Sequence, residues 1–368
     1  MTIYIFTFLL FSLFAYFEVR INLTEYNKNV LYVITFLCLI FQVGFRWETG
    51  TDWVPYYTHF LAAGSFEKIF IDVLLGFEIG YGYFVYIIRS FTDSYTIFLV
   101  IHALLYYLLV FKANELLSPY PFTSMFIYYT STMGILGSNR QLLALAICLY
   151  SLKFILEKKS KLFFLFVFLA FLFHTSALFF LVYYFLNRDF KKYFVISVLV
   201  LAIVIGKSSI PAYFFSNFAN FLGGASSDKT EAYALNQLSE TSLSLTGLIR
   251  RLLFFTLFIV NYDFLVKKWQ NYRLIFNGYV FGLCIYFLFK DTFMILVGRG
   301  GFYFNVMECF LLASQLLLFK YKKERSYILI ILLIYACLIF YQSISEYPML
   351  FLPYKGLFIN EYFPRDGL

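Results

Sequence analysis

Ten apolar runs, each about as long as the hydrocarbon core of a membrane is thick, leave this chain little choice of fold. They lie at residues 4–17, 30–45, 95–111, 121–137, 140–156, 192–206, 248–266, 273–289, 297–319 and 327–343. Only 14% of the residues are charged, whereas a soluble domain carries about 25%. The runs show no strand-like alternation, and only helices and closed barrels satisfy every backbone amide in lipid. The sequence therefore predicts an all-α, polytopic integral membrane protein with about ten crossings.

Positive charge indicates which loops face the cytoplasm. Six short loops hold 17 of the 29 basic residues: 18–29, 112–120, 153–161, 187–192, 267–273 and 320–325. This bias accounts for the net charge of +8, so the charge does not require a nucleic-acid partner. Residues 4–17 lack a basic leader and a cleavage site, so we expect an uncleaved first helix. Ten crossings then place both termini outside.

Two further segments are expected to enter the membrane without crossing it. Residues 162–186 lie between two basic loops, which favours a hairpin of two short helices with its turn near Phe173–Ala177. Each half reaches only about 18 Å at about 1.5 Å per residue. The same argument makes 78–92 a short outer-side helix. Irregular backbone at such depth is tolerated where it lines a wet cavity, which predicts a site.

The expected domain organisation is a single transmembrane domain with two notable outer segments. The ranges are 1–368 for the domain, 45–94 for a first outer loop with its short dipping helix, and 207–246 for a large outer loop. No Gly-rich phosphate loop, Walker motif or zinc-ligand spacing occurs. We therefore expect no metal and no cofactor.

Arginine and lysine are distributed differently on this topology. Thirteen of the 18 lysines lie in the cytoplasmic loops, but seven of the 11 arginines do not: Arg46, Arg89, Arg140, Arg250, Arg251, Arg299 and Arg365. Arginine is suited to bidentate phosphate recognition. Arginines at the outer ends of several helices are what a lipid-linked diphosphate requires. The alternative is that each arginine reaches for the interface or pairs with Glu48, Asp52 or Glu78.

Four short patches, in their order along the chain, resemble the EpsG family of polysaccharide polymerases, within the wider Wzy-type O-antigen and capsule polymerases. The patches are Arg46-x3-Gly50-x-Asp52-x3-Tyr56-x3-Phe60 followed by Glu78-x-Gly80-Tyr81; Asn139-Arg140-Gln141-x2-Ala144; Phe173-His174-x-Ser176-Ala177-Leu178; and Arg299-x2-Phe302-Tyr303-Phe304 with a late Pro353-Tyr354-Lys355.

The resemblance implies a metal-independent glycosyltransferase of the GT-C type at the outer face of the bacterial inner membrane, facing the periplasm or the outside. It would transfer a growing glycan from undecaprenyl diphosphate onto the non-reducing sugar of a new undecaprenyl-diphosphate-linked repeat unit. Its partners would be these lipid-linked glycans and the membrane lipids, and a chain-length regulator protein is a further candidate partner.

Such a reaction needs positive charge at the leaving diphosphate. Arg140 begins a predicted helix at the outer face, and Arg250 and Arg251 begin another, so helix N-termini would add oriented N–H groups. Arg299 lies among glycines that allow close approach of a bulky ligand. These four and Arg46 are the candidate diphosphate-binding residues.

The acceptor hydroxyl needs a general base. Asp52 is the first candidate, and Glu78 and His174 are the others. The structural alternatives are an Asp52–Arg46 ion pair and a hydrogen-bonded core histidine. The other two histidines, His59 and His102, have weaker claims.

Three aromatic residues are candidates for sugar contact because they flank the charged cluster, where their rings can stack on sugar faces: Trp47, Tyr56 and Tyr81. Interfacial anchoring is the alternative for aromatic residues at this depth, above all for Trp53.

Two other functions use similar features. An O-antigen ligase would share the donor and the arginines, and only the resemblance favours the polymerase. A flippase or transporter for the lipid-linked sugar would be expected to carry matching halves. The Arg46–Asp52 cluster has no counterpart after residue 200, which argues against a transporter.

Overall fold

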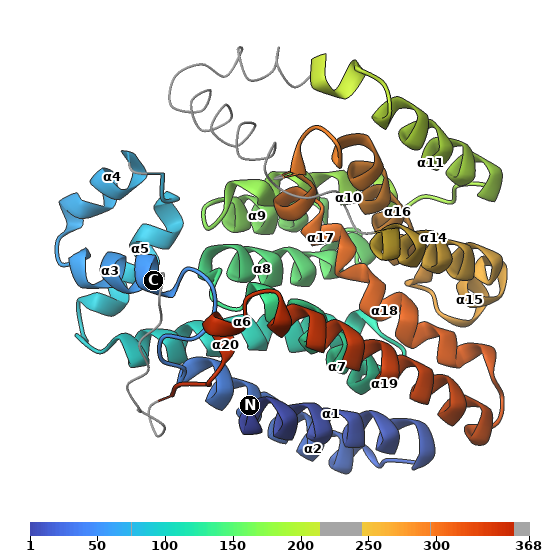
Figure 1. Ribbon diagram of the computed structural model, residues 1–368, viewed down its shortest axis with the longest axis horizontal. Coiled ribbons are helices and arrows are strands. Elements are labelled where there is room, and N and C mark those ends of the chain that lie inside the picture. Colours follow the sequence, from blue (N-terminus) through green and yellow to red (C-terminus); the bar gives the residue numbers. More distant parts are fainter. Residues whose placement is uncertain (75, 214–244, 295, 357–368) are drawn as a thin grey trace. The chain divides into compact units, whose positions relative to one another are not determined.

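The computed structural model describes residues 1–74, 76–213, 245–294 and 296–356 (Figure 1). Every regular element in these ranges is a helix, and the remaining backbone pairing is one isolated bridge between Arg46 and Gly356. The prediction of an all-α protein is confirmed.

Seven helical segments in the described part of the chain are long and apolar enough to cross a membrane. They are α1 (Thr2–Arg20), α2 (Glu25–Gly44), α6 (Tyr95–Leu117), α8 (Asn139–Leu156), α16 (Tyr272–Phe289), the segment Leu296–Leu318, and α19 (Lys322–Ser345). The segment Leu296–Leu318 is built from η3 (Leu296–Gly300), α17 (Phe302–Asn305), α18 (Met307–Ser314) and η4 (Gln315–Leu318). The chain is therefore a multi-pass membrane protein, as predicted.

The other three predicted crossings correspond to shorter helices. They are α7 (Pro121–Thr132) with η1 (Met133–Ile135), α11 (Lys192–Gly206), and α14 (Leu245–Val260) with α15 (Tyr262–Lys268). Proline at the first turn of α7 sets where this helix begins, since the residue before proline disfavours helical backbone. That these three cross the membrane stays a prediction.

The two segments expected to be short helices are short helices. The predicted hairpin consists of α9 (Ser160–Phe171) followed by η2 (Thr175–Val182) and α10 (Tyr183–Leu186), with a break at residues 172–174. The outer segment contains α3 (Trp53–Ala62), α4 (Phe66–Leu74) and α5 (Ile79–Arg89), which lie together at the left of Figure 1. The helix predicted at 78–92 corresponds to α5, whereas α3 and α4 lie where a loop was expected. Their depth in the membrane stays a prediction.

The chain divides into two compact units, Met1–Leu181 with Leu312–Leu368, and Val182–Leu311. In the first unit α6 packs between α2 and α8, α8 contacts α9, and α7 contacts α1 and α19. In the second unit α16 packs against α11, α14, α15 and α17. A single transmembrane domain stays a prediction. Residues 214–244 of the predicted 207–246 outer loop lie outside the described residues.

Basic segments of the first unit gather at one end of its helices. Lys322 Nζ donates to the Arg20 carbonyl (3.2 Å) and to Asn22 Oδ1 (2.7 Å). At the same end the Glu18 carboxylate accepts hydrogen bonds from the backbone N–H groups of Phe122 and Thr123 and so caps the start of α7.

The opposite end of these helices brings together segments far apart in the sequence. Tyr4 donates to the Phe351 carbonyl (3.2 Å), and the Gly50 N–H donates to the Leu350 carbonyl (2.7 Å). α20 (Pro348–Phe351) and the segment after it therefore lie beside the segment that follows α2. The 20 residues of α2 separate the two ends by about 30 Å.

Candidate functional site

Arg140 is the second residue of α8 and is held by two other segments of the first unit, α3 and the residues before α5. Its Nη1 donates to Glu78 Oε2 (2.6 Å) and to the Gly76 carbonyl (3.2 Å), and its Nε donates to the Tyr56 hydroxyl (3.2 Å). The guanidinium also lies 4.6 Å from the centre of the Phe77 ring, a cation–π distance. Its Nη2 makes no hydrogen bond to any described residue, and the side chain is 22% exposed. One donor edge of Arg140 is thus available to a ligand.

Glu78 links Arg140 to the break after α9. Its second oxygen, Oε1, accepts from the Thr175 N–H (3.1 Å). The N–H groups of Gly80 and Tyr81, at the start of α5, both donate to the Leu172 carbonyl (2.9 and 3.3 Å). These bonds fix His174 close to the Arg140–Glu78 pair, where its Nδ1 lies 2.6 Å from Ser176 Oγ. Three of the predicted patches therefore meet here.

Arg46 is buried, with 1% of its surface exposed, and it contacts Asn139, the first residue of α8. Its Nη2 donates to Asn139 Oδ1 (2.8 Å) and its Nη1 to the Val43 carbonyl (3.0 Å). No described carboxylate lies within ion-pairing distance of it, so the Arg46–Asp52 pair weighed as an alternative is not formed. His102 Nε2 lies 2.9 Å from the Asn139 carbonyl, which can only accept, so Nε2 carries the proton. Arg46 and His102 together hold the residue before Arg140.

Asp52 lies on the other flank of the same helix start. Its carboxylate accepts a hydrogen bond from Ser138 Oγ (3.2 Å), and the residue is exposed. The Thr51 N–H donates to the Leu136 carbonyl (2.7 Å), so the loop before α3 and the loop before α8 run in direct contact. Asp52 and Arg140 therefore flank the N-terminus of α8.

Lys355, close to the C-terminus in sequence, lies beside the segment that follows α2. Its ammonium pairs with Glu48, its carbonyl accepts from the Trp47 N–H (3.0 Å), and the residue is buried. This is the contact that brings the Pro353–Lys355 part of the fourth patch to the first.

A buried histidine–carboxylate pair lies beneath the Arg140 site and was missed in the sequence. His59 Nε2 lies 2.9 Å from Asp72 Oδ2, and Lys68 Nζ lies 3.1 Å from Asp72 Oδ1. The His59 ring stacks on Phe77 at 4.2 Å. Burial lowers the pKa of His59, and the Asp72 carboxylate acts in the opposite direction. The Lys68–Asp72 spacing of four residues on a helix was the available signal.

The aromatic candidates differ in accessibility. Trp47 is half-buried, whereas Tyr56 and Tyr81 are buried, with Tyr56 turned to Arg140. Sugar contact by any of the three stays a prediction.

The remaining predicted arginines lie elsewhere. In the second unit Arg251 donates to the Gly247 carbonyl (3.0 Å), lies 3.9 Å above the Tyr286 ring, and is within electrostatic range of Arg250 and Glu308. Arg299 is exposed on η3 of the same unit. Arg89 pairs with Asp93 in the first unit, and Arg365 lies outside the described residues. That the two sets of arginines share one substrate stays a prediction.

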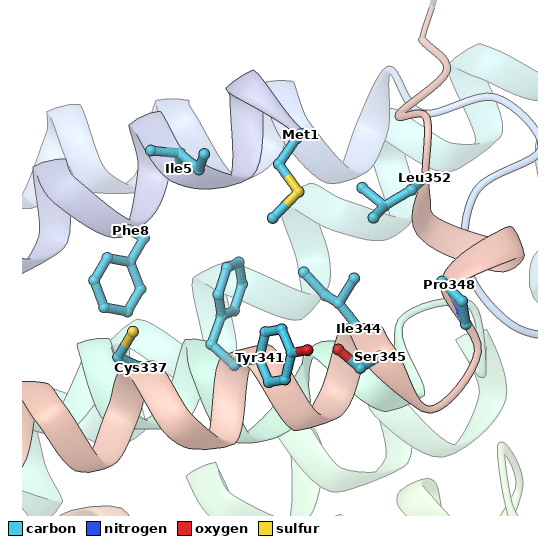
Figure 2. A pocket seen from close by; sticks show the side chains of 10 residues that line it. Met1, Ile5, Phe8, Cys337, Tyr341, Ile344, Ser345, Pro348 and Leu352 are labelled. Atoms are coloured by element: carbon cyan, nitrogen blue, oxygen red, sulfur yellow. The ribbon is translucent and has the colours of Figure 1, made fainter.

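An apolar cavity of about 320 Å³ opens between α1 and α19 near the end where Lys355 lies. Figure 2 shows the side chains that line it, among them Met1 before α1, Ile5 and Phe8 from α1, Cys337, Tyr341 and Ile344 from α19, and Pro348 and Leu352. Its lining is almost entirely hydrocarbon, so it suits an apolar chain.

The model of the EpsG family matches residues 29–356 of the sequence. The chain belongs to the EpsG family. The match covers all four patches and confirms the resemblance inferred from them. No curated protein and no solved structure matches the chain. Within the described ranges, no group of three His, Cys, Asp or Glu side chains is placed to hold a metal ion. Metal independence stays a prediction.

Two glycines allow the loops before α3 and α8 to touch, which yields a test of the site's assembly. Gly50 and Gly137 both have positive φ (96° and 117°), and a Cβ at Gly137 would overlap the Thr51 carbonyl oxygen. We expect Gly137→Ala to lower the free energy of unfolding by about 2–4 kcal/mol. The measurement is denaturant titration of the purified protein in detergent.

The matched control is Gly64→Ala, because a Cβ at Gly64 meets nothing within 4 Å. We expect this variant to stay within about 1 kcal/mol of the wild type. Equal stabilities for the two variants would contradict the proposed loop contact.

Proposed function

We propose that this EpsG family member is a polysaccharide polymerase. It joins undecaprenyl-diphosphate-linked oligosaccharide repeat units at the outer face of the bacterial inner membrane, as a metal-independent glycosyltransferase of the GT-C type. The observation that carries the proposal is the arrangement at the start of α8. There Arg140, with an unengaged Nη2, is paired with Glu78, and a second carboxylate, Asp52, is held by Ser138 directly before the same helix.

The reaction breaks the bond between the anomeric carbon and a diphosphate oxygen. Negative charge then develops on the leaving undecaprenyl diphosphate, and Arg140 together with the N–H groups of the first turn of α8 would stabilise it. The Ser138 side chain does not cap this helix, and its hydroxyl donates to Asp52 instead. Glu78 holds the guanidinium in place before the substrate arrives. Arg250, Arg251 and Arg299, in the second unit, stay predicted diphosphate-binding residues.

The acceptor sugar hydroxyl must lose its proton as its oxygen bonds to the anomeric carbon. Asp52 is the best-placed base because it is exposed and its described contact is a hydroxyl that donates to it. Glu78 is engaged by Arg140 and Thr175, so both of its oxygens already accept hydrogen bonds. His174, with its Ser176 contact, is the second candidate base.

The lipid part of the substrate fits the apolar lining of the cavity between α1 and α19. The apolar cavity between α1 and α19 ends at Pro348 and Leu352, three residues before Lys355. An isoprenoid chain packed there would have its polar end beside the first unit's charged segments.

We expect Arg140→Ala to lower kcat for glycan polymerisation by about 100-fold or more, because it removes preorganised charge at the leaving group. Arg140→Lys should recover only part of the rate, since an ammonium is a point charge without the bidentate fork. The measurement is the initial rate of glycan-ladder formation from a synthetic lipid-linked repeat unit in detergent.

Arg20→Ala is the matched control, because Arg20 is an exposed arginine at the opposite end of the first unit, and it should keep the wild-type rate. A wild-type rate for Arg140→Ala would contradict the assignment of the diphosphate site. Transfer of glycan to a lipid A core without any ladder would instead identify a ligase.

Asp52→Asn keeps the size and the Ser138 contact but removes the base. We expect kcat to fall by about 100- to 10,000-fold with little change in KM. Glu67→Gln is the control, because Glu67 is an exposed carboxylate on α4 of the same outer segment. If Asp52→Asn is fully active while His174→Gln is not, the base is His174.

A further inference from the structure

A cavity of about 340 Å³, lined by both aromatic and polar residues, faces a different side of α3 from the Arg140 site. The residues that line it include Trp47, Tyr57, Asp93, Ser94, Tyr95 and Thr96. Tyr56 and Tyr57 follow one another on α3, about 100° apart around the helix. Tyr56 contacts Arg140, whereas Tyr57 lines this cavity. One short helix therefore connects the charged centre with a second site.

One wall of the cavity is a fixed aromatic surface. Trp53 and Tyr95 are buried beneath it and hold the two half-buried rings in place. Trp53 stacks on Tyr57 at 4.9 Å and meets Trp47 edge-on at 4.9 Å. Tyr95 meets Tyr57 at 5.2 Å. The accessible surfaces of Trp47 and Tyr57 are thus presented without the entropy cost of ordering them.

Three residues with polar side chains, Asp93, Ser94 and Thr96, also line the cavity. The Asp93 side chain is 90% exposed and pairs with Arg89 at its base. Ser94 caps α6 by accepting a hydrogen bond from the Ile97 N–H, which leaves its own hydroxyl hydrogen to donate. Thr96 adds a second hydroxyl, and both residues are partly exposed. Carboxylate acceptors and hydroxyl groups that donate and accept therefore line the same cavity as the aromatic rings.

This combination selects among ligand classes. A pyranose ring has an apolar face of C–H groups that packs on an aromatic ring, and a rim of hydroxyls that hydrogen-bond to carboxylate and hydroxyl groups. An anion is disfavoured by the Asp93 carboxylate. A hydrocarbon chain would leave these polar groups without partners, and it has the apolar cavity between α1 and α19 instead.

We propose that this cavity binds a pyranose residue of the glycan, remote from the bond that is broken. The proposal rests on the polymerase function and extends it to substrate selection. The sugar can come from the growing chain or from the incoming repeat unit, because both present the same chemistry. Tyr57 and Asp93 are the residues that set specificity, and neither contacts Arg140.

The test is the affinity of the purified, detergent-solubilised protein for the repeat-unit oligosaccharide freed of its lipid by mild acid, measured by calorimetry. Tyr57→Leu removes the ring and Asp93→Asn removes the carboxylate, and we expect each to raise Kd by about tenfold or more. Tyr57→Phe keeps the ring face, and Arg89→Gln breaks the Asp93 ion pair without touching the cavity. Both variants should keep Kd within about threefold of the wild type. For Arg89→Gln the reason is that an exposed ion pair contributes little.

Unchanged Kd in Tyr57→Leu and Asp93→Asn would overturn the proposal, as would displacement of the ligand by glycerophosphoglycerol, which would assign the cavity to a lipid headgroup. A protein that polymerises but binds no free oligosaccharide would overturn the sugar site and leave the function intact. Oligosaccharide binding that depends on Tyr57, without any polymerisation, would support the sugar site and overturn the polymerase function.

The glycan products of the Tyr57→Leu and Asp93→Asn variants distinguish the two sources of the sugar. If the first linkage forms at the normal rate and later linkages are lost, the cavity binds the growing chain. If the first linkage is slowed, the cavity binds the incoming repeat unit.

Discussion

The hydrogen bond from Arg46 to Asn139 is the interaction on which the polar end of the first unit depends. A guanidinium that is 1% exposed and has no described carboxylate partner is costly unless its donors are used. Its hydrogen bonds to Val43 and Asn139 tie the end of α2 to the start of α8, and His102 secures Asn139 from α6. Arg140 follows directly, so its position is set by buried contacts and only its ligand-facing edge remains open.

Two sites then extend from one short helix. Through Tyr56, α3 contacts the charged centre formed by Arg140 and Glu78, and through Tyr57 it contacts the aromatic and polar cavity. A polymerase has to hold a diphosphate where charge develops and a neutral glycan at some distance from it. The separation of charged and neutral chemistry on two faces of α3 suits both tasks, and it lies at the end of the helices away from the basic loops.

The sequence predicted what depends on local pattern. Apolar runs define the helices of the first unit, and the flanking basic loops identified residues 162–186 as a hairpin of short helices. Contacts between distant residues had no such signal. Arg140 meets Glu78 across 62 residues and Lys355 meets Glu48 across 307, and no periodicity encodes either pair. The same reason hid the His59–Asp72 pair and the role of His102, which looked like a lone polar residue in an apolar helix.

The central claim is that this chain moves a glycan off undecaprenyl diphosphate onto a second lipid-linked repeat unit without a metal. The most direct measurement supplies purified wild-type protein with a synthetic undecaprenyl-diphosphate repeat unit in the presence of EDTA, and counts free undecaprenyl diphosphate against new glycosidic linkages. One lipid diphosphate released for each linkage formed is the predicted result. Intact substrate with folded protein, or turnover that appears only when a divalent metal is restored, would contradict the account.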